Sequence, residues 1–422
     1  MEMDIQVDAE NDGLHNKISP RGKYAIFIGV LLNLTSGIQY CWSLLGKQMI
    51  SDFGWTAVQA TRPYSIITLV SSLWSIAAGR WGDSKKPRYP IIFGGCMLGG
   101  GLILSSMHQN PLLMCITGGA MLGLSSSSIT CNVAASSIKW APFSKKGLVT
   151  GIATCGLALS SVYMTPLING LLGNVGLRNT FVYMGIAALV LVPLLAFLHP
   201  QPDKSKFDQP QEGNNNTAVD NSKYKNTITP NQALKTKELY ICALIYFCGA
   251  MCGQVLASQA TLIAQAQVPE WTGGAMLVII LAVFNALGRF FWSAAGDKIG
   301  PFSAAKFMLG IQFVNLLCFN FYTNATTLII GTAVLGFCFG GDVPLLWGWL
   351  TSIYGSKYCG SLQGMVTTVW GLSGTIGPIF AAYLMDTTGS YTSAYIGMAV
   401  IVLIGFGATF LIKDQKILPA KS

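Results

Sequence analysis

Long apolar runs alternate with short polar connections along almost the whole chain. Each run has the roughly 20 residues that a helix needs to cross the hydrocarbon core of a bilayer. We therefore expect an all-α membrane protein with twelve transmembrane helices. The spans are expected at 24–46, 57–79, 89–107, 111–138, 147–169, 179–198, 238–263, 271–294, 303–321, 327–353, 359–384 and 391–412.

Three segments break this pattern, and they divide the chain into two halves. Residues 1–23 and 413–422 are polar and read as cytoplasmic tails. The segment 199–237 carries six lysines and few apolar residues, so it buries too little surface to fold and is expected to be a disordered cytoplasmic linker. The six-helix halves are then residues 24–198 and 238–412.

The two halves share a repeated pattern. Matching glycines and prolines recur at offsets of 214, 213 and 212 residues: Gly82 with Gly296, Gly147 with Gly360, and Pro166 with Pro378. Offsets that agree this closely indicate a duplicated unit of about 210 residues. Transporters built from such repeats place their binding site where the two units meet.

Composition and charge point the same way. Hydrophobic residues make up 52% and charged residues 10% of the chain, against about 25% charged in a typical soluble domain. With the N-terminus in the cytoplasm, 22 of the 26 lysines and arginines fall on cytoplasmic segments. The net charge of +9 therefore reflects the orientation in the membrane, with both termini in the cytoplasm, and does not indicate nucleic-acid binding. The expected membrane is the plasma membrane (the inner membrane of a bacterium). The exceptions are Lys47, Arg62, Arg178 and Arg289.

Other kinds of chemistry find no support in the sequence. No Walker loop is present, so ATP is not the expected energy source. All three histidines, His15, His108 and His199, lie outside the expected spans, and nothing resembles a nucleophile with its base. The 11 cysteines form no CxxC pair and are expected to pack as small apolar residues. We expect no enzyme activity, no cofactor and no metal.

The loop after the second span carries the first family resemblance. It reads Gly79-Arg80-Trp81-Gly82-Asp83-Ser84-Lys85-Lys86-Pro87-Arg88 and resembles the signature loop of the major facilitator superfamily. Ser84 and Pro87 depart from that signature. An acidic residue facing basic ones at a helix end can latch the halves together on the cytoplasmic side, or the charges can simply anchor the helix end among headgroups. The candidate latch residues are Arg80, Asp83, Lys85, Lys86 and Arg88, with Asp297 and Lys298 in the second half.

Three further segments resemble the oxalate/formate antiporter branch, which is related to the monocarboxylate transporters. They are Ser36-Gly37-Ile38-Gln39-Tyr40-Cys41-Trp42-Ser43, Phe284-Asn285-Ala286-Leu287-Gly288-Arg289 and Gly296-Asp297-Lys298-Ile299-Gly300. The superfamily resemblance covers nearly the whole chain, whereas the branch resemblance rests on these segments. The branch resemblance implies that Arg289 binds the carboxylate of the substrate.

Arg289 is the strongest candidate on physical grounds as well. It lies about seven residues before Gly296, roughly 10 Å from the cytoplasmic end of its span. An arginine at that depth is costly unless it meets an anion in an aqueous cavity, and its planar fork suits a carboxylate. The alternative is an arginine that snorkels to the interface. Asn285, one turn earlier, faces the same side and either donates to the substrate or packs between helices.

Asp342 lies near the middle of the tenth span and has two interpretations. An ionisable residue inside a membrane is a default candidate for proton coupling. The surrounding Gly340-Gly341-Asp342-Val343-Pro344 is also typical of a helix restart, in which Asp342 would be the N-cap. Both roles are compatible, because broken helices line many transport sites.

Departures from the resembled families narrow the substrate. The lysine that oxalate antiporters carry in span eleven aligns with Trp370. The animal monocarboxylate transporters carry an aspartate one turn before the arginine, which aligns with Asn285, and a lysine in span one, which aligns near Leu44. A single buried cation favours a monoanion, because a dianion would keep one uncompensated charge in a medium of low dielectric. Tyr40, Phe339 and Trp370 are candidates for an aromatic wall around a short carbon chain.

The sequence thus predicts a secondary active transporter for a small organic monocarboxylate (similar to lactate, pyruvate or formate), coupled to a proton and functional as a monomer in membrane lipid. The first alternative is an oxalate/formate-type anion exchanger, and the second is a membrane carboxylate sensor that does not transport. An exporter of cationic or neutral amphiphiles fits less well, because such a cavity would be acidic and would lack Arg289.

Overall fold

The computed structural model describes residues 19–84, 86–138, 140, 146–200, 229–354 and 359–412, and every regular element within them is helical. The N-terminal half contains α2 (Pro20–Ser36), η1 (Gly37–Cys41), α3 (Trp42–Phe53), α4 (Ala57–Ser84), α5 (Arg88–Ser105), α6 (Pro111–Met114), η2 (Cys115–Ala120), α7 (Met121–Ile138) and α8 (Lys146–Leu198). The C-terminal half contains α9 (Pro230–Ala233), α10 (Lys237–Gln267), η6 (Thr272–Gly274), α11 (Ala275–Ile299), α12 (Pro301–Cys318), η7 (Phe319–Phe321), α13 (Ala325–Tyr354), α14 (Cys359–Thr388) and α15 (Thr392–Ala408).

Each expected span coincides with a helical segment, so the all-α prediction is confirmed. The fifth and sixth spans are joined in the 53-residue α8, which is interrupted only at Gly176, where φ is 76°. Within the described residues, nine helices are long and apolar enough to cross a membrane when α8 is counted once. α15 is a shorter apolar helix of 17 residues, and α4 is missing from the nine although it has 28 residues.

The polar character of α4 has a structural reason. Thr61, Ser65, Thr68 and Ser72 lower its hydropathy, yet all four are buried. Thr68 faces α14 closely: a Cβ added at Gly374 of α14 would lie 2.8 Å from the Thr68 hydroxyl oxygen. α4 is therefore an interior helix at the boundary of the halves, where small polar side chains serve as packing surface and internal hydrogen-bond partners.

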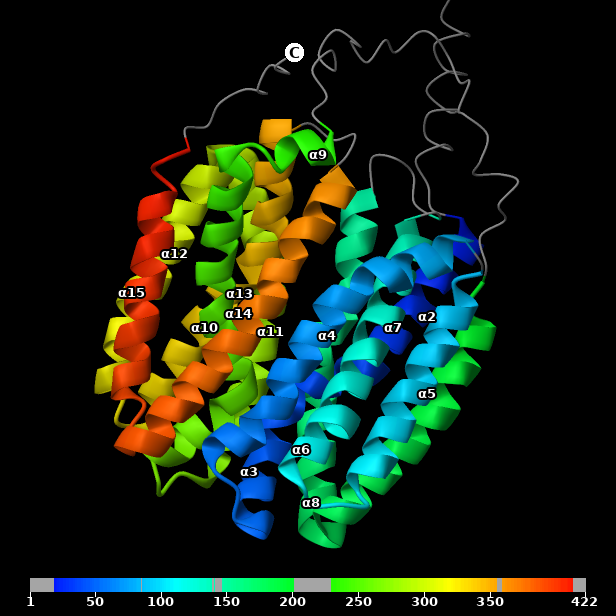
Figure 1. Cartoon of the computed structure of the whole chain (residues 1–422), viewed down its shortest axis with the longest axis vertical. Coiled ribbons are helices and arrows are strands. Elements are labelled where there is room, and N and C mark those ends of the chain that lie inside the picture. Colours follow the sequence, from blue (N-terminus) through cyan, green and yellow to red (C-terminus); the bar gives the residue numbers. More distant parts are fainter. Residues whose placement is uncertain are drawn as a thin grey trace, which may run out of the picture.

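Two helical bundles stand side by side, one per half (Figure 1). α2 begins and α15 ends at the same end of the molecule, which we call the tail end; the opposite end, with the turn between α3 and α4, is the distal end. The short helix α9 also lies at the tail end, inside the segment that was expected to be a disordered linker. Residues 201–228 of that segment are outside the described residues.

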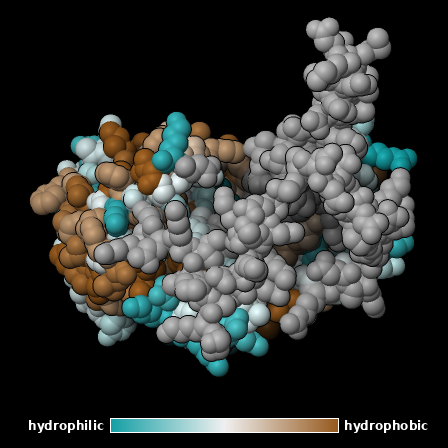
Figure 2. Space-filling model, turned by 90° about the horizontal axis from the view of Figure 1, so that it is seen from above, coloured by the Kyte–Doolittle hydropathy of each residue, from teal (hydrophilic) through white to brown (hydrophobic). Residues whose placement is uncertain are grey.

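The outer surface of the bundles is apolar. Phe307, Val314, Leu403 and Phe410 are among the exposed large hydrophobic residues of the C-terminal half, and seen from above this half is rimmed by hydrophobic side chains (Figure 2). A soluble protein rarely exposes such continuous apolar surface. Together with the apolar helices, this identifies an integral membrane protein.

Three side-chain hydrogen bonds join the two halves in the interior. The Tyr64 hydroxyl donates to Gln254 Oε1 at 2.6 Å, and the Thr261 hydroxyl donates to the Ser43 carbonyl at 2.6 Å. The Thr375 hydroxyl donates to the Ser65 carbonyl at 3.1 Å. All three lie between the middle of the bundle and the distal end, so within the described residues the hydrogen-bonded contact of the halves is on the distal side.

Candidate transport site

The candidate site is built on a close contact between α11 and α13. A Cβ at Gly288 would overlap the Phe337 carbonyl, and one at Gly340 would overlap the Asn285 carbonyl. A Cβ at Gly336 would lie 2.8 Å from the carbonyl of Leu281. Glycines spaced in this way let two membrane helices touch backbone to backbone. The contact brings Asn285 and Arg289 of α11 beside the middle of α13.

Arg289 is half-buried, and Asn285, one helical turn earlier, lies on the same side of α11 and bonds to it. Arg289 Nε donates to Asn285 Oδ1 at 3.2 Å, and Asn285 is 2% exposed. This bond uses one of the five N–H donors of the guanidinium. Within the described part of the chain, Arg289 makes no ion pair. Its remaining donors are therefore available to an anion.

Asp342 lies in α13 and is 1% exposed. Neither carboxylate oxygen has a hydrogen-bond partner among the described residues. The side chain points toward α10, because a Cβ at Gly249 would lie 2.5 Å from Asp342 Oδ1. A buried carboxylate without a partner is costly as an anion. The structure thus isolates a titratable group inside the C-terminal half.

The helix-restart interpretation of Asp342 is wrong. α13 runs from Ala325 to Tyr354 without interruption and contains Pro344 in its interior. Asp342 accepts no backbone hydrogen bond of the kind an N-cap makes. The preceding glycines have a packing role instead: Gly340 touches α11, and a Cβ at Gly341 would lie 2.6 Å from both the Met308 sulfur and the ring of Trp292.

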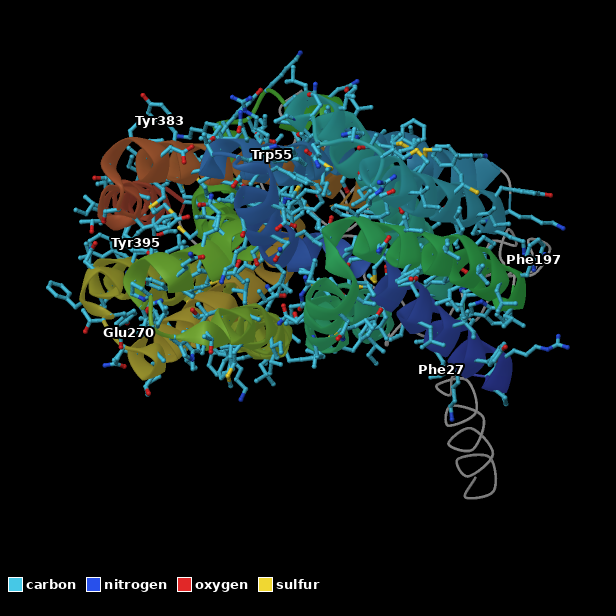
Figure 3. The ribbon with its side chains drawn as sticks, turned by 90° about the horizontal axis from the view of Figure 1, so that it is seen from below. Phe27, Trp55, Phe197, Glu270, Tyr383 and Tyr395 are labelled. Carbon is cyan, nitrogen blue, oxygen red and sulfur yellow. The ribbon has the colours of Figure 1, made fainter. Side chains whose placement is uncertain are left out.

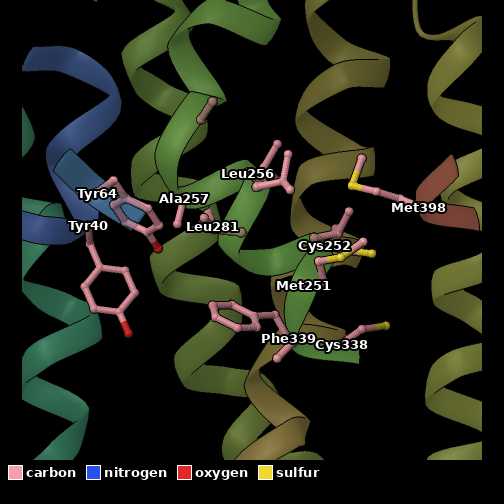
Figure 4. Packing of buried hydrophobic residues seen from close by; sticks show 14 of the residues in the cluster. Tyr40, Tyr64, Met251, Cys252, Leu256, Ala257, Leu281, Cys338, Phe339 and Met398 are labelled. Carbon is pink, nitrogen blue, oxygen red and sulfur yellow. The ribbon is translucent and has the colours of Figure 1, made fainter. Parts of the chain in front are cut away.

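Tyrosines from both halves converge on these charged groups. Tyr40 of η1 is 8% exposed and interacts electrostatically with Arg289. Tyr246 of α10 is 3% exposed and interacts electrostatically with Asp342, Arg289 and Tyr40. In the close view, Tyr40 and Tyr64 of the N-terminal half lie opposite the packed residues of α10 and α13 (Figure 4). Arg289 therefore sits near the boundary of the two halves.

The other two aromatic candidates have different surroundings. The ring of Phe339 fills the space over Gly253 of α10, where a Cβ would overlap it, so this side chain also packs α13 against α10. Trp370 of α14 is half-buried and packs against the interior cluster. Tyr40 is thus the aromatic candidate that lies within electrostatic range of Arg289.

Sequence reasoning missed several polar residues of the interior. Tyr246 lies within electrostatic range of both charged groups. Gln254 Oε1 accepts from Tyr64, while Gln254 Nε2 has no partner among the described residues. Gln312 of α12 donates to the Gly249 carbonyl at 3.0 Å, next to Asp342. A glutamine inside an apolar span is itself a signal for an interior helix face, and Gln254 and Gln312 carried that signal.

The latch candidates are only partly visible. The side chains of Arg80, Asp83 and Asp297, and the whole of Lys85, lie outside the described residues. Lys86, just before α5, and Lys298, in the last turn of α11, are exposed.

Arg88 makes its contacts within the N-terminal half. It donates to the Ala196 carbonyl at 3.1 Å and to the Phe197 carbonyl at 3.0 Å, and its guanidinium lies 5.2 Å from the centre of the Phe197 ring. A cation is favoured at a helix C-terminus, so Arg88 anchors α5 to the end of α8. Burial, together with the Arg88 charge, lowers the pKa of His199 at this junction to about 4.

Two helical bundles from a duplicated unit, with charged residues near their boundary, define a membrane transporter of the two-half type. The chain belongs to the Major Facilitator Superfamily, whose sequence model matches residues 26–321 and 275–421. This shows both the family and the fold that the signature loop predicted.

Known relatives agree with this assignment. The chain is 24% identical over 397 residues to the oxalate:formate antiporter of Oxalobacter formigenes, covering 92% of this chain and 91% of the relative. It is 23% identical to monocarboxylate transporter 13 of Rattus norvegicus, covering 89% and 84%. Among solved structures, an inward-facing, unoccupied bacterial homolog of the human lysosomal transporter Spinster superposes with a TM-score of 0.71 at 14% identity, covering 93% of this chain and 97% of that one. The last likeness concerns the fold alone.

Proposed function

We propose that this transporter moves a small organic monocarboxylate by alternating access, in symport with a proton. The observation that carries the proposal is the half-buried Arg289, held by Asn285 near the boundary of the halves and free of any ion pair within the described residues. A membrane-embedded cation of this kind is stabilised by an anion, and here the anion would be the substrate that binds and dissociates during transport.

The charge of the cargo follows from the number of cations. A guanidinium binds one carboxylate through two parallel N–H···O bonds. The position that carries a lysine in oxalate antiporters is Trp370 here, so no second cation from α14 is available to a dianion. A monoanion such as lactate, pyruvate or formate leaves no uncompensated charge at this site.

Asp342 is the proposed coupling residue. Its carboxylate is unpartnered and points toward Gly249 of α10. Binding a proton removes the cost of burying its charge. Tyr246 lies within electrostatic range of both Asp342 and Arg289, so both charges act on the same part of the interior. The proton and the substrate anion would then enter together as a neutral pair.

The names of the relatives support an organic anion and leave one rival. The antiporter of Oxalobacter formigenes is named for oxalate and formate, and the mammalian relatives are named for monocarboxylates. Exchange of two anions needs no proton, and it is the alternative that the first of these names favours. The presence or absence of proton coupling therefore distinguishes the two functions.

The test is uptake of labelled lactate, pyruvate, formate and oxalate into proteoliposomes, with and without an inward proton gradient. We expect gradient-driven accumulation of a monoanion, reduced at least about thirtyfold in Arg289→Ala, because loss of a buried charged partner costs roughly 2–5 kcal/mol. Arg178→Ala, which removes an exposed arginine, is the matched control and should transport normally. Oxalate flux that ignores the gradient would establish the exchanger instead. Binding without flux of any anion would establish a sensor.

A further inference from the structure

The first turn of α4 is capped partly by its own half and partly by the other. Thr56 and Gln59 form a reciprocal capping pair. The backbone N–H of Gln59 donates to Thr56 Oγ1 at 3.2 Å, and the backbone N–H of Thr56 donates to Gln59 Oε1 at 3.0 Å. The backbone N–H groups of Ala57 and Val58 lie in the first turn of α4, where no intrahelical acceptor is available to them. They donate to Oδ1 and Oδ2 of Asp386, each at 2.9 Å. Asp386 belongs to α14, so one carboxylate from the C-terminal half completes a helix cap of the N-terminal half.

The charge of Asp386 suits the end of α4 and not the end of its own helix. Asp386 lies in the last turn of α14, which ends at Thr388. The helix macrodipole disfavours an anion at a C-terminus and favours one at an N-terminus. Separation of the halves would break two charge-assisted hydrogen bonds and leave the carboxylate at the unfavourable end of α14. The view of the distal end shows Trp55, in the α3–α4 turn, on the side of the N-terminal half that faces α14 and its Tyr383 (Figure 3).

This cap has no counterpart in the internal repeat. Gly176 and Gly389 both have positive φ and are 213 residues apart, so the same offset relates Asp386 to Gly173. The proline offset of 212 relates it to Asn174 instead. Asn174 Nδ2 donates to the Gly170 carbonyl of its own helix at 2.8 Å. Neither position offers a carboxylate to the C-terminal half, so among the described residues of the distal end this inter-half cap occurs once.

We propose that Asp386 is a gating residue that holds the distal ends of the two halves together and thereby sets the balance between the two states of the transporter. Deeper in the same seam lie the three bonds made by Tyr64, Thr261 and Thr375. Opening of the distal end breaks the Asp386 contact first. This inference needs only two halves that separate during transport, and it holds whichever anion is carried.

Hydrogen–deuterium exchange of the full-length protein in lipid nanodiscs, without substrate, tests the proposal. Asp386→Asn removes the charge from one side of the contact. Ala57→Pro removes a donor from the other side, at the N1 position where proline is well tolerated. Both should raise exchange about fivefold, the size expected for loss of one such terminal charge interaction. The increase should reach the seam peptides around Ser43 and from Gln254 to Thr261, as well as the first turn of α4.

Two control variants separate gating from local capping. Asp52→Asn alters an exposed acid near the distal end that accepts from Gln48 of its own helix at 2.7 Å, and it should behave as wild type. Gln59→Leu breaks the capping pair inside α4 and should raise exchange there alone. If Asp386→Asn and Ala57→Pro also act only on the first turn of α4, Asp386 is a local cap and the gating role is wrong. Because exchange is measured without substrate, this result is independent of any failure to find a transported monocarboxylate.

Discussion

The two halves pack their helices alike but carry different chemistry. A Cβ at Gly123 of α7 would lie 2.8 Å from the Ile67 carbonyl of α4, and one at Gly336 of α13 would lie 2.8 Å from the Leu281 carbonyl of α11. Gly123 and Gly336 are 213 residues apart, and Ile67 and Leu281 are 214 apart. Duplication therefore preserved this helix contact.

Two turns further along the same helices the resemblance ends. The offset of 214 relates Arg289 to Ser75 and Asn285 to Ser71, and the offset of 213 relates Asp342 to Ile129. Ser75 donates to the Ser72 carbonyl of its own helix at 2.7 Å, and Ile129 is fully buried. The scaffold is shared, whereas the charged groups belong to the C-terminal half alone.

The largest effect is expected for Asp342→Asn, the near-isosteric change that removes the titratable group. Accumulation driven by a proton gradient should fall to background, because no group is left to take up the proton. Exchange of labelled for unlabelled substrate should persist, since Arg289 and Asn285 are intact. Both rates are measured in the same proteoliposomes.

The matched change in the other half is Ile129→Val at the counterpart of Asp342, and it should leave both rates near wild type. Loss of exchange as well as accumulation in Asp342→Asn would contradict the coupling role and make Asp342 a structural residue of the C-terminal half.

The shared helix contact predicts equal effects in the two halves. Gly123→Ala and Gly336→Ala each place a methyl group 2.8 Å from a backbone carbonyl. Overpacking of this kind costs typically 1–3 kcal/mol, so each variant should lower the apparent melting temperature in detergent by a similar amount. A shift confined to one half would show that the duplicated contact is no longer equivalent. Gly170→Ala, at a glycine with nothing within 4 Å of its Cβ position, is the control.

The sequence predicts contacts between residues of one helix better than contacts between residues that are far apart in the chain. Hydropathy locates the spans, and the spacing of one helical turn predicts that Asn285 and Arg289 lie on the same side of one helix, although not that they bond to each other. Both are local properties of one helix. By contrast, Asp342 of α13 approaches Gly249 of α10. These residues are almost a hundred positions apart, and spacing along the sequence does not reveal such a contact.

The glycines before Pro344 misled the prediction for the same reason. Glycine-rich sequence before a proline indicates a helix break when read alone. In the fold, Gly340 allows close contact with the backbone of α11, and Gly341 leaves space for the side chains of Met308 and Trp292. The helix continues through Pro344. Membrane helices tolerate an interior proline because neighbouring helices stabilise the freed backbone groups. Whether such glycines break a helix or pack it closely depends on the neighbouring helices, and the sequence alone does not show which helices these are.

Asn285→Ser replaces the holder of Arg289 by the residue type found at its counterpart, Ser71. The 3.2 Å bond from Arg289 Nε is lost, and a hydroxyl on the shorter side chain does not reach the same position. A hydrogen bond to a charged group contributes about 1.5–3 kcal/mol, part of which a bound anion restores by orienting the guanidinium itself. We expect KM for the substrate to rise about tenfold, equivalent to about 1.4 kcal/mol, with the maximal rate little changed. An unchanged KM would show that Asn285 serves only the packing of α11.

The smallest effect is expected at Ser75, the counterpart of Arg289. Its hydroxyl donates to a carbonyl three residues earlier, a bond that is local to α4 and adds little to helix stability. Ser75→Ala should therefore change uptake by less than about twofold and stability by less than about 0.5 kcal/mol. The measurement is the same uptake assay beside Arg289→Ala, with the melting temperature recorded for both variants. A large loss of uptake in Ser75→Ala at unchanged stability would place substrate contacts on α4 and show that the N-terminal half also carries part of the chemistry.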